Sequence, residues 1–257
     1  MATTMPAAQK IEIPYPHSGQ LELLLRLGPC RFTVRPADGP AWISGTYDDP
    51  TGVLPLDVAV GPRTAIKQRV DFTAFSGAAI PRLDLAISRE RPFVLDVEVG
   101  ANDSLFDFGG LPLSRLAVKT GASRSEIDFS QPNPTVMSLL ELSTGAGAFT
   151  AKRLANANFT GFRFGGGVAA CALDFGGTLL RDSTARVDAG LGSVDISVPA
   201  TTAVRVRSKS FASAVQAGGA FSRIDDTYGT PPVAQGAHPL LEIDASLAFG
   251  GLNLTTT

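Results

Sequence analysis

The sequence predicts an all-β protein that folds as a single-chain β-helix, or solenoid, with short strands, glycine corners and about 20–25 residues per coil. Apolar and polar residues alternate with a period of two in most segments, which is typical of half-buried strands. Helical spacing is nearly absent, and 27 glycines and 18 prolines would interrupt helices of ordinary length. The same unit also recurs along the chain, as an alternating stretch, a glycine corner and a second alternating stretch.

The alternative is a β-sandwich, which has many short strands and turns of similar composition. The recurrence of the glycine corner in the same phase of each unit favours the solenoid. The clear units lie at 95–108 around Gly100, 116–129 around Gly121, 140–149 around Gly145 and Gly147, 162–175 around Gly165, and 185–198 around Gly190 and Gly192. Weaker units lie at 21–34 around Gly28, 215–224 around Gly218 and Gly219, and 241–254 around Gly250 and Gly251.

Stacked units predict an internal ladder of side chains in the core. Because Phe108, Phe129, Phe149 and Phe175 take similar places in their units, we expect them to lie above one another. The corner glycines are expected to adopt positive φ, which only glycine does without steric cost. Gly190→Val should then destabilise the protein by about 1 to 3 kcal/mol.

The proline-containing residues 1–20 are expected to be an irregular N-terminal lead-in or cap. Residues 21–257 are expected to form one continuous β-solenoid domain, with a loop near 225–239 where prolines cluster again. One unit alone cannot bury its apolar face, so neighbouring coils must cover it and the two ends need caps or partners.

Composition and charge narrow the classes of partner. The formal net charge is -2, and no run of Lys or Arg could neutralise several phosphates together, so we expect no nucleic-acid partner. Neither a signal peptide nor a long apolar span occurs, so we expect no membrane span and a cytoplasmic location. Cys30 and Cys171 match neither a metal nor a disulfide pattern and are interpreted as buried thiols that act as small hydrophobic side chains.

The sequence offers few side chains for catalysis or metal binding. The two histidines, His17 and His238, lie in proline-containing segments, and no G-x-S-x-G motif accompanies them. The pairs Asp48–Asp49 and Asp225–Asp226 could serve a hydrolase or bind a cation. Their turn-like surroundings favour a structural role, because Asp hydrogen-bonds its own backbone in turns. We therefore predict no catalytic, cofactor-binding or metal-binding residues, no cofactor and no enzymatic activity.

Several short segments occur in an order more specific than any one of them. Near the N-terminus are LELLLRLGPCRFTV at 21–34 and WISGTY at 42–47. Further along are FGGLPLSRL at 108–116, DFSQPNP at 128–134, LANANF at 154–159, LDFGG at 173–177 and GLGSV at 190–194. In this order the chain resembles the bacterial toast-rack domain family, roughly from Leu21 to Val206. The resemblance implies a β-helical domain related to the C-terminal part of LiaF-type cell-envelope stress proteins and to adhesins, with no catalytic residues to carry over.

The predicted function is a non-catalytic β-solenoid interaction or scaffold module, which the resemblance links to envelope stress sensing or adhesion. The expected partner is another protein, or a second copy that joins through the solenoid ends. One alternative is a self-assembling structural protein, because an uncapped solenoid end presents unpaired backbone groups. Another is a carbohydrate-active β-helix enzyme, because the β-helix fold hosts enzymes and the chain contains Asp pairs.

Overall fold

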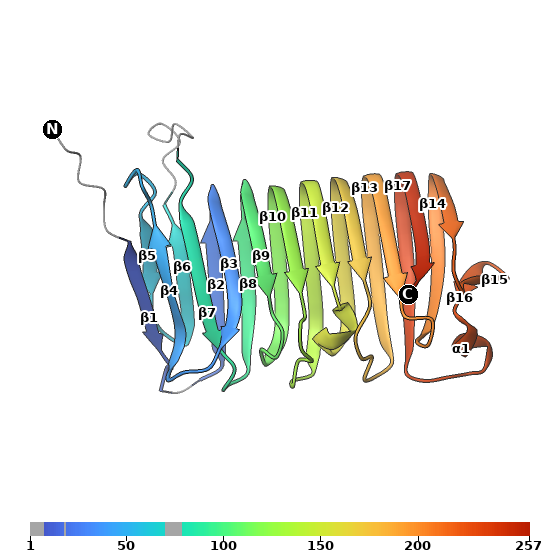
Figure 1. Ribbon diagram of the computed structural model, residues 1–257, viewed down its shortest axis with the longest axis horizontal. Coiled ribbons are helices and arrows are strands. Elements are labelled where there is room, and N and C mark those ends of the chain that lie inside the picture. The colour runs from blue at the N-terminus through green and yellow to red at the C-terminus, as the bar shows by residue number, and fades with distance from the viewer. Residues whose placement is uncertain (1–7, 18, 70–78) are drawn as a thin grey trace.

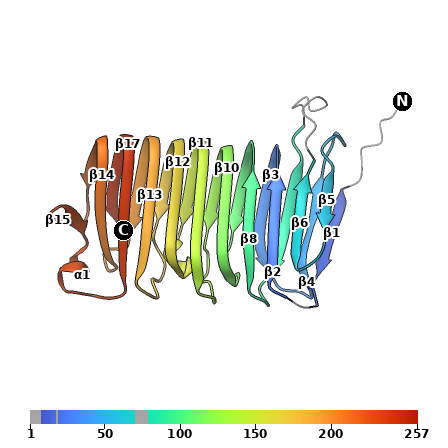
Figure 2. The same ribbon diagram turned by 180° about the vertical axis from the view of Figure 1, so that it is seen from behind.

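Strands stacked one behind another build an elongated solenoid (Figure 1). The computed structural model describes residues 8–17, 19–69 and 79–257, and its strands belong to one continuous hydrogen-bonded sheet that winds into coils. The view from behind shows the same order of strands along the axis (Figure 2). Because the central coils pair in parallel, unlike the strands of an antiparallel sandwich, the predicted all-β solenoid is confirmed.

In the central coils one long strand makes two sides of a coil. In β10 the even-numbered Leu116 and Val118 are buried before the corner, and the odd-numbered Ile127 is buried after it. The extra residue Gly121, which is skipped in the pairing with the next strand, causes this change of phase. Apolar side chains therefore face the core on both sides of the bend. The central strands are β10 (Leu113–Asp128), β11 (Met137–Lys152), β12 (Phe159–Asp174) and β13 (Ser183–Val198), with the 3₁₀ helix η1 (Leu154–Ala157) after β11.

The N-terminal coils do not stack in the order of the sequence. β2 and β3 form the two halves of one coil, which lies between the coil of β6 and β7 and the coil of β8 and β9. The antiparallel strands β1, β4 and β5 complete this end. The bounds are β1 (Gln9–Pro14), β2 (Leu21–Leu27), β3 (Cys30–Ala37), β4 (Ala41–Asp48), β5 (Leu56–Ala59), β6 (Arg63–Gln68), β7 (Arg82–Ser88), β8 (Phe93–Val99) and β9 (Asn102–Asp107).

At the C-terminal end, as at the N-terminal end, the strands do not stack in the order of the sequence. The last strand, β17, lies between β13 and β14 and pairs in parallel with both (Figure 1). The hairpin of β15 and β16 pairs with the first half of β14, and the short helix α1 leads back to β17. The bounds are β14 (Ala203–Ala217), β15 (Ser222–Ile224), β16 (Thr227–Gly229), α1 (Pro231–Ala234) and β17 (Leu240–Thr256).

The prediction of a unit at 215–224 is wrong, because it places the corner too late in the sequence. The corner of β14 lies earlier, where Phe211 is skipped between the paired residues Ser210 and Ala212. Gly218 follows the end of the strand, and its N–H donates to the carbonyl of Leu254. The corner was missed because it contains no glycine. The prediction placed the corner at the nearest glycine pair instead.

Both segments expected to be irregular contain regular structure. Within 1–20, β1 pairs antiparallel with β4 although Pro14 ends it, while residues 1–7 and 18 lie outside the described part of the chain. Within 225–239, strand β16 and helix α1 precede the return to β17. These segments add strands at the ends of the stack, where coils alone would leave edges unpaired.

The expected phenylalanine ladder forms only in part. The rings of Phe108 and Phe129 lie 5.9 Å apart on neighbouring coils. Phe149 belongs to another row, opposite Cys171, and its ring lies 5.4 Å from that of Phe164. The number of residues between the corner and the phenylalanine differs between units. The phenylalanines therefore do not all fall in the same row of the sheet.

The corner glycines serve two different steric purposes. Gly192, Gly147 and Gly250 have positive φ, with φ 139° at Gly192, and share one row of the sheet. At Gly190, where positive φ was expected, the restriction is instead contact: an added Cβ would lie 2.9 Å from the carbonyl oxygen of Gly167 on the previous coil. The first glycine of a corner thus allows close stacking, and the later one allows the turn.

Gly192→Ala is expected to lower the free energy of unfolding by about 1 to 3 kcal/mol, because the Cβ would be strained at positive φ and would lie 2.0 Å from the carbonyl oxygen of Ala169. Gly61→Ala is the control, since no atom lies within 4 Å of an added Cβ there and φ is not positive. Urea unfolding followed by circular dichroism measures both. Equal losses in the two variants would contradict the corner geometry.

Candidate functional site

The two histidines lie apart from one another on the surface. His17 is exposed beside the N-terminal strands. His238 Nδ1 lies 2.9 Å from Asp182 Oδ1, and the same carboxylate oxygen accepts a hydrogen bond of 2.8 Å from the N–H of Leu240. The hydrogen bond from His238 and that backbone N–H hold the pKa of Asp182 below its usual value. This cluster fixes the start of β17.

The carboxylate pairs lie in turns. Asp49 accepts hydrogen bonds from the N–H and hydroxyl of Thr51 and from the N–H of Leu54. Although partial burial raises the pKa of Asp49, these hydrogen bonds more than offset it, and the pKa is lowered overall. Asp225 and Asp226 form the two-residue turn between β15 and β16, with Asp225 in the left-handed region (φ 52°). Asp49 and Asp225 thus take part in the turn geometry that their surroundings indicated.

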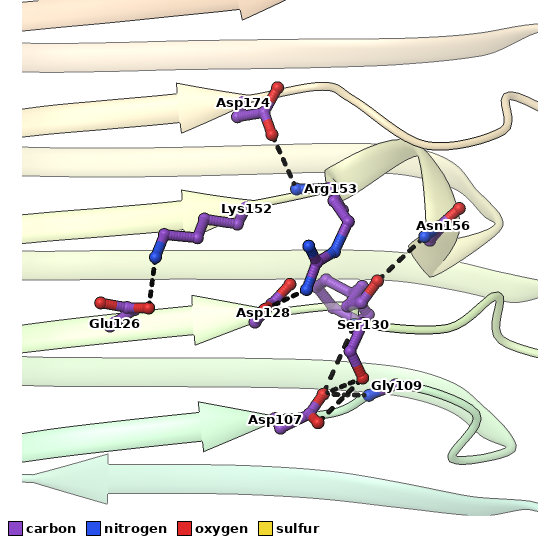
Figure 3. A network of polar contacts seen from close by, with 10 residues as sticks. Asp107, Gly109, Glu126, Asp128, Ser130, Lys152, Arg153, Asn156 and Asp174 are labelled. Carbon is purple, nitrogen blue, oxygen red and sulfur yellow. Dashed lines mark hydrogen bonds and ion pairs between the residues drawn. The ribbon is translucent and has the colours of Figure 1, made fainter.

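A polar network follows the ends of β9 to β12, where the coils turn into their connecting segments (Figure 3). Asp107 accepts from Ser130 Oγ at 2.7 Å and from the N–H of Gly109 at 2.9 Å. On the next coil, the carboxylate of Asp128 pairs with the guanidinium of Arg153. The N–H of Arg153 in turn donates to Asp174. These carboxylates tie each coil to its neighbour.

Asp128 is the most constrained member of this network. Its Oδ1 atom is buried, and no hydrogen-bond partner for it is present among the described residues. Burial raises the pKa of Asp128, and nearby Asp107 adds to that effect, while Arg153 opposes it. Within the described part of the chain, no three or more His, Cys, Asp and Glu side chains are grouped so as to hold a metal ion. We interpret the network as structural.

Both cysteines are buried and unpaired, as the sequence predicted. Burial raises the pKa of the Cys30 thiol to about 12 and that of Cys171 to about 11. A thiol with such a pKa is almost fully protonated at neutral pH, so neither is suited to act as a nucleophile. They fill the core as small apolar side chains.

The most unusual surface is an exposed row of apolar side chains along the corners of the solenoid. Each member follows a corner residue, and strand pairing places each beside the next on the adjacent coil. Val168, Leu191 and Phe249 remain 58%, 51% and 54% exposed. The side chains grow in size toward the C-terminal end. We call this row the corner ridge, which consists of Ala122, Ala146, Val168, Leu191 and Phe249.

A shallow depression of about 720 Å³ lies beside the large end of the corner ridge. Small residues form its floor, because Gly166, Ala189 and Gly190 present little or no side chain. Asp188 and Lys209 place opposite charges in its lining. The ridge and the depression together offer an apolar projection next to a recess, which is the relief that a complementary protein surface can fill.

Sequence reasoning missed the corner ridge. The corners were interpreted as turns, and the alternation that separates core from surface breaks at that point. The available signal was the apolar residue directly after the corner in Gly167-Val168, Gly190-Leu191 and Ala248-Phe249. An apolar residue at a turn that recurs in register across neighbouring strands indicates an exposed row.

The coils and their glycine corners define the class of this protein as a β-solenoid. The sequence matches the family model for the N-terminal domain of toast-rack over residues 4–139. The chain therefore belongs to the toast-rack family. The match ends within β11, and the same coil geometry continues beyond it.

A search of the solved structures matched proteins from three bacteria. They are a "putative cell adhesion protein" from Clostridium sporogenes ATCC 15579 (12% identity, TM-score 0.49, covering 98% of this chain and 100% of that one), a "putative adhesin" from Bacteroides fragilis NCTC 9343 (10%, 0.35, 96% and 96%) and a "putative adhesin" from Parabacteroides merdae ATCC 43184 (11%, 0.29, 96% and 95%). A search of the curated proteins found no significant match. Among the described residues, none of the helices has the length and apolar character needed to span a membrane.

Asp128 is expected to titrate above the ordinary aspartate pKa of about 3.9, whereas Asp49 titrates below it. For Asp128 the raised folded-state pKa means that stability is lost as pH rises from the unfolded pKa through the folded one. For Asp49 the sign is opposite, and stability is lost as pH falls through its folded pKa. Carboxyl ¹³C shifts followed by NMR across a pH series measure both. Titration of Asp128 at or below Asp49 would contradict the burial argument.

Neither thiol is expected to react readily with DTNB in the folded protein. Because only the thiolate attacks the reagent and both side chains are buried, unfolding in urea should raise the reaction rate by roughly a hundredfold or more. Absorbance of the released thionitrobenzoate measures the rate. Rapid modification of one thiol in the native protein would show that its coil opens or that the thiol is exposed.

Proposed function

We propose that this chain is a non-catalytic recognition module that binds another protein through its corner ridge. The row of exposed apolar side chains carries the proposal. Single exposed apolar residues are ordinary on protein surfaces, whereas a contiguous apolar row marks an interaction surface. Here the register of the sheet makes the row contiguous, since Val168 pairs with Leu191 and Leu191 with Phe249.

The energetics favour a partner that also fills the depression. Full burial of a Val, Leu or Phe side chain contributes about 1.5 to 3 kcal/mol, so covering three half-exposed ones contributes about 1 kcal/mol each. This contribution alone does not offset the entropy lost on association. The partner should therefore place apolar side chains against the small residues of the depression and a negative charge opposite Lys209.

A carbohydrate-active enzyme is less well supported. The Asp pairs that suggested it lie in turns, and Asp49 uses its oxygens to hold the turn that follows. Asp107 likewise engages its carboxylate with Ser130 and Gly109. A general acid and base need carboxylates free to meet a substrate. We therefore favour binding over catalysis.

Membership of the toast-rack family supports a role in cell-envelope stress sensing or adhesion, in which the bound protein would belong to the envelope system. A cytoplasmic location for the chain itself stays a prediction. Fractionation of cells that naturally produce the protein, followed by immunoblotting, tests it.

The ridge is tested with a photoreactive benzoyl-phenylalanine at position 191 in the full chain. Irradiation of cells that naturally produce the protein is expected to give a specific adduct, whose partner is identified by mass spectrometry. Leu191→Ser and Phe249→Ser should each weaken binding of the purified partner by roughly tenfold, since a centrally buried apolar contact is lost. Both side chains are half exposed, so the melting temperature should change little.

Leu180 provides the matched control. It is 53% exposed and lies between β12 and β13, outside the corner ridge. Leu180→Ser should leave binding unchanged, and benzoyl-phenylalanine at position 180 should not give the adduct. The same adduct from both positions, or unchanged binding by both ridge variants, would reject the ridge as the binding surface.

A further inference from the structure

The sheet ends in several strand edges, which differ in what lies along them. Within residues 8–17, 19–69 and 79–257, β1 pairs only with β4, β5 only with β6, and β15 only with β16. At the C-terminal end, β16 pairs with Arg205–Arg207 and so covers part of the first half of β14. The second half of β14 pairs with β17 on its inner side, and among the described strands none pairs with its outer side.

Most of these edges carry features that discourage the addition of another strand. β1 has Lys10 and Glu12, which form an exposed ion pair of 2.8 Å, and it ends in Pro14. β5 is four residues long and contains Asp57, and β15 is three residues long and contains Arg223. Charged residues, proline and short length all protect strand edges.

The second half of β14 has none of these features. Residues 211–217 read FASAVQA, without a charge, a proline or a glycine. The side chains of Ala214, Gln216 and Ala217 are exposed, and that of Val215 is half-buried. An extended, uncharged edge of this kind presents backbone N–H and C=O groups that only another extended strand satisfies in regular register.

We propose that the second half of β14 is a dimer interface, at which two copies of this chain pair antiparallel about a two-fold axis. A second copy fits this edge because it brings the same uncharged strand in the same extended conformation. Ala214 lies at the centre of 211–217, so the axis that pairs the whole stretch passes beside Ala214. Ala214 of one copy then faces Ala214 of the other across the axis, and no like charges meet because 211–217 contains no charged residue.

The comparison of the strand edges predicts that assembly stops at the dimer. A two-fold interface uses the same surface on both copies and is closed once it forms. Growth into a filament would need a second unprotected edge, and β1, β5 and β15 are each protected. In the antiparallel arrangement the corner of one copy lies beside the far end of the strand in the other. The two corner ridges are then separate, and the dimer presents both of them.

The experiment is analytical ultracentrifugation of the full chain over a concentration series, with one variant and one matched control. Ala214→Lys places two like charges beside the axis and should raise the dimer dissociation constant by roughly tenfold or more. Ala170→Lys is the control, because Ala170 is also exposed and lies in the same outward row through Ser193 and Gly251. It belongs to an interior strand and should leave the dimer unchanged.

A second measurement is independent of the charge variant. Ala214→Cys should form an intermolecular disulfide under mild oxidation, whereas Ala170→Cys should not, and the natural thiols are buried. A monomeric wild-type chain at all concentrations, filaments, equal effects of both lysine variants or no disulfide from Ala214→Cys would each overturn the proposal. Partner binding by the ridge is read out separately by cross-linking at position 191, so failure of the dimer leaves the proposed function intact.

Discussion

At the glycine corners of the central coils, the backbone of one coil lies directly against the backbone of the next. Hydrogen bonds between parallel strands set that separation, and a side chain at the contact would force the coils apart. An added Cβ at Gly121 would lie 3.1 Å from the carbonyl oxygen of Gly100, and one at Gly167 would lie 2.3 Å from that of Gly145. The glycines therefore hold the register between coils. Once the register is fixed, residues at equivalent places form rows, and the corner ridge is one of these rows.

The exchange of order at both ends depends on the same uniform geometry. Each coil offers its neighbour the same parallel edge, so the strand that follows in space need not follow in sequence. β17 lies between β13 and β14, and the coil of β2 and β3 lies between two coils that come later in the chain. β5 and β14, which are internal to the sequence, consequently form outer edges of the stack. The protected edges at β1 and β5 and the open edge at β14 result from this arrangement.

The period-two pattern and the glycine corners were enough to predict the fold class and most coils, because both are local consequences of strand geometry. The order of stacking could not be predicted, since repeated coils carry the same pattern and do not encode which neighbour each one meets. The corner of β14 was missed because Phe211 stands where the central coils have glycine. The candidate site was missed for a related reason: an apolar residue after a corner has no assigned face until the register with its neighbours is known.

The two inferred surfaces have different physical origins and need not fail together. The corner ridge consists of side chains, so it depends on the identity of Leu191 and Phe249. The β14 edge consists of backbone groups, so it depends on the absence of charged residues, proline and glycine from 211–217. Both require β17, which supplies Phe249 to the ridge and pairs with the inner side of β14. Neither surface is therefore complete without β17.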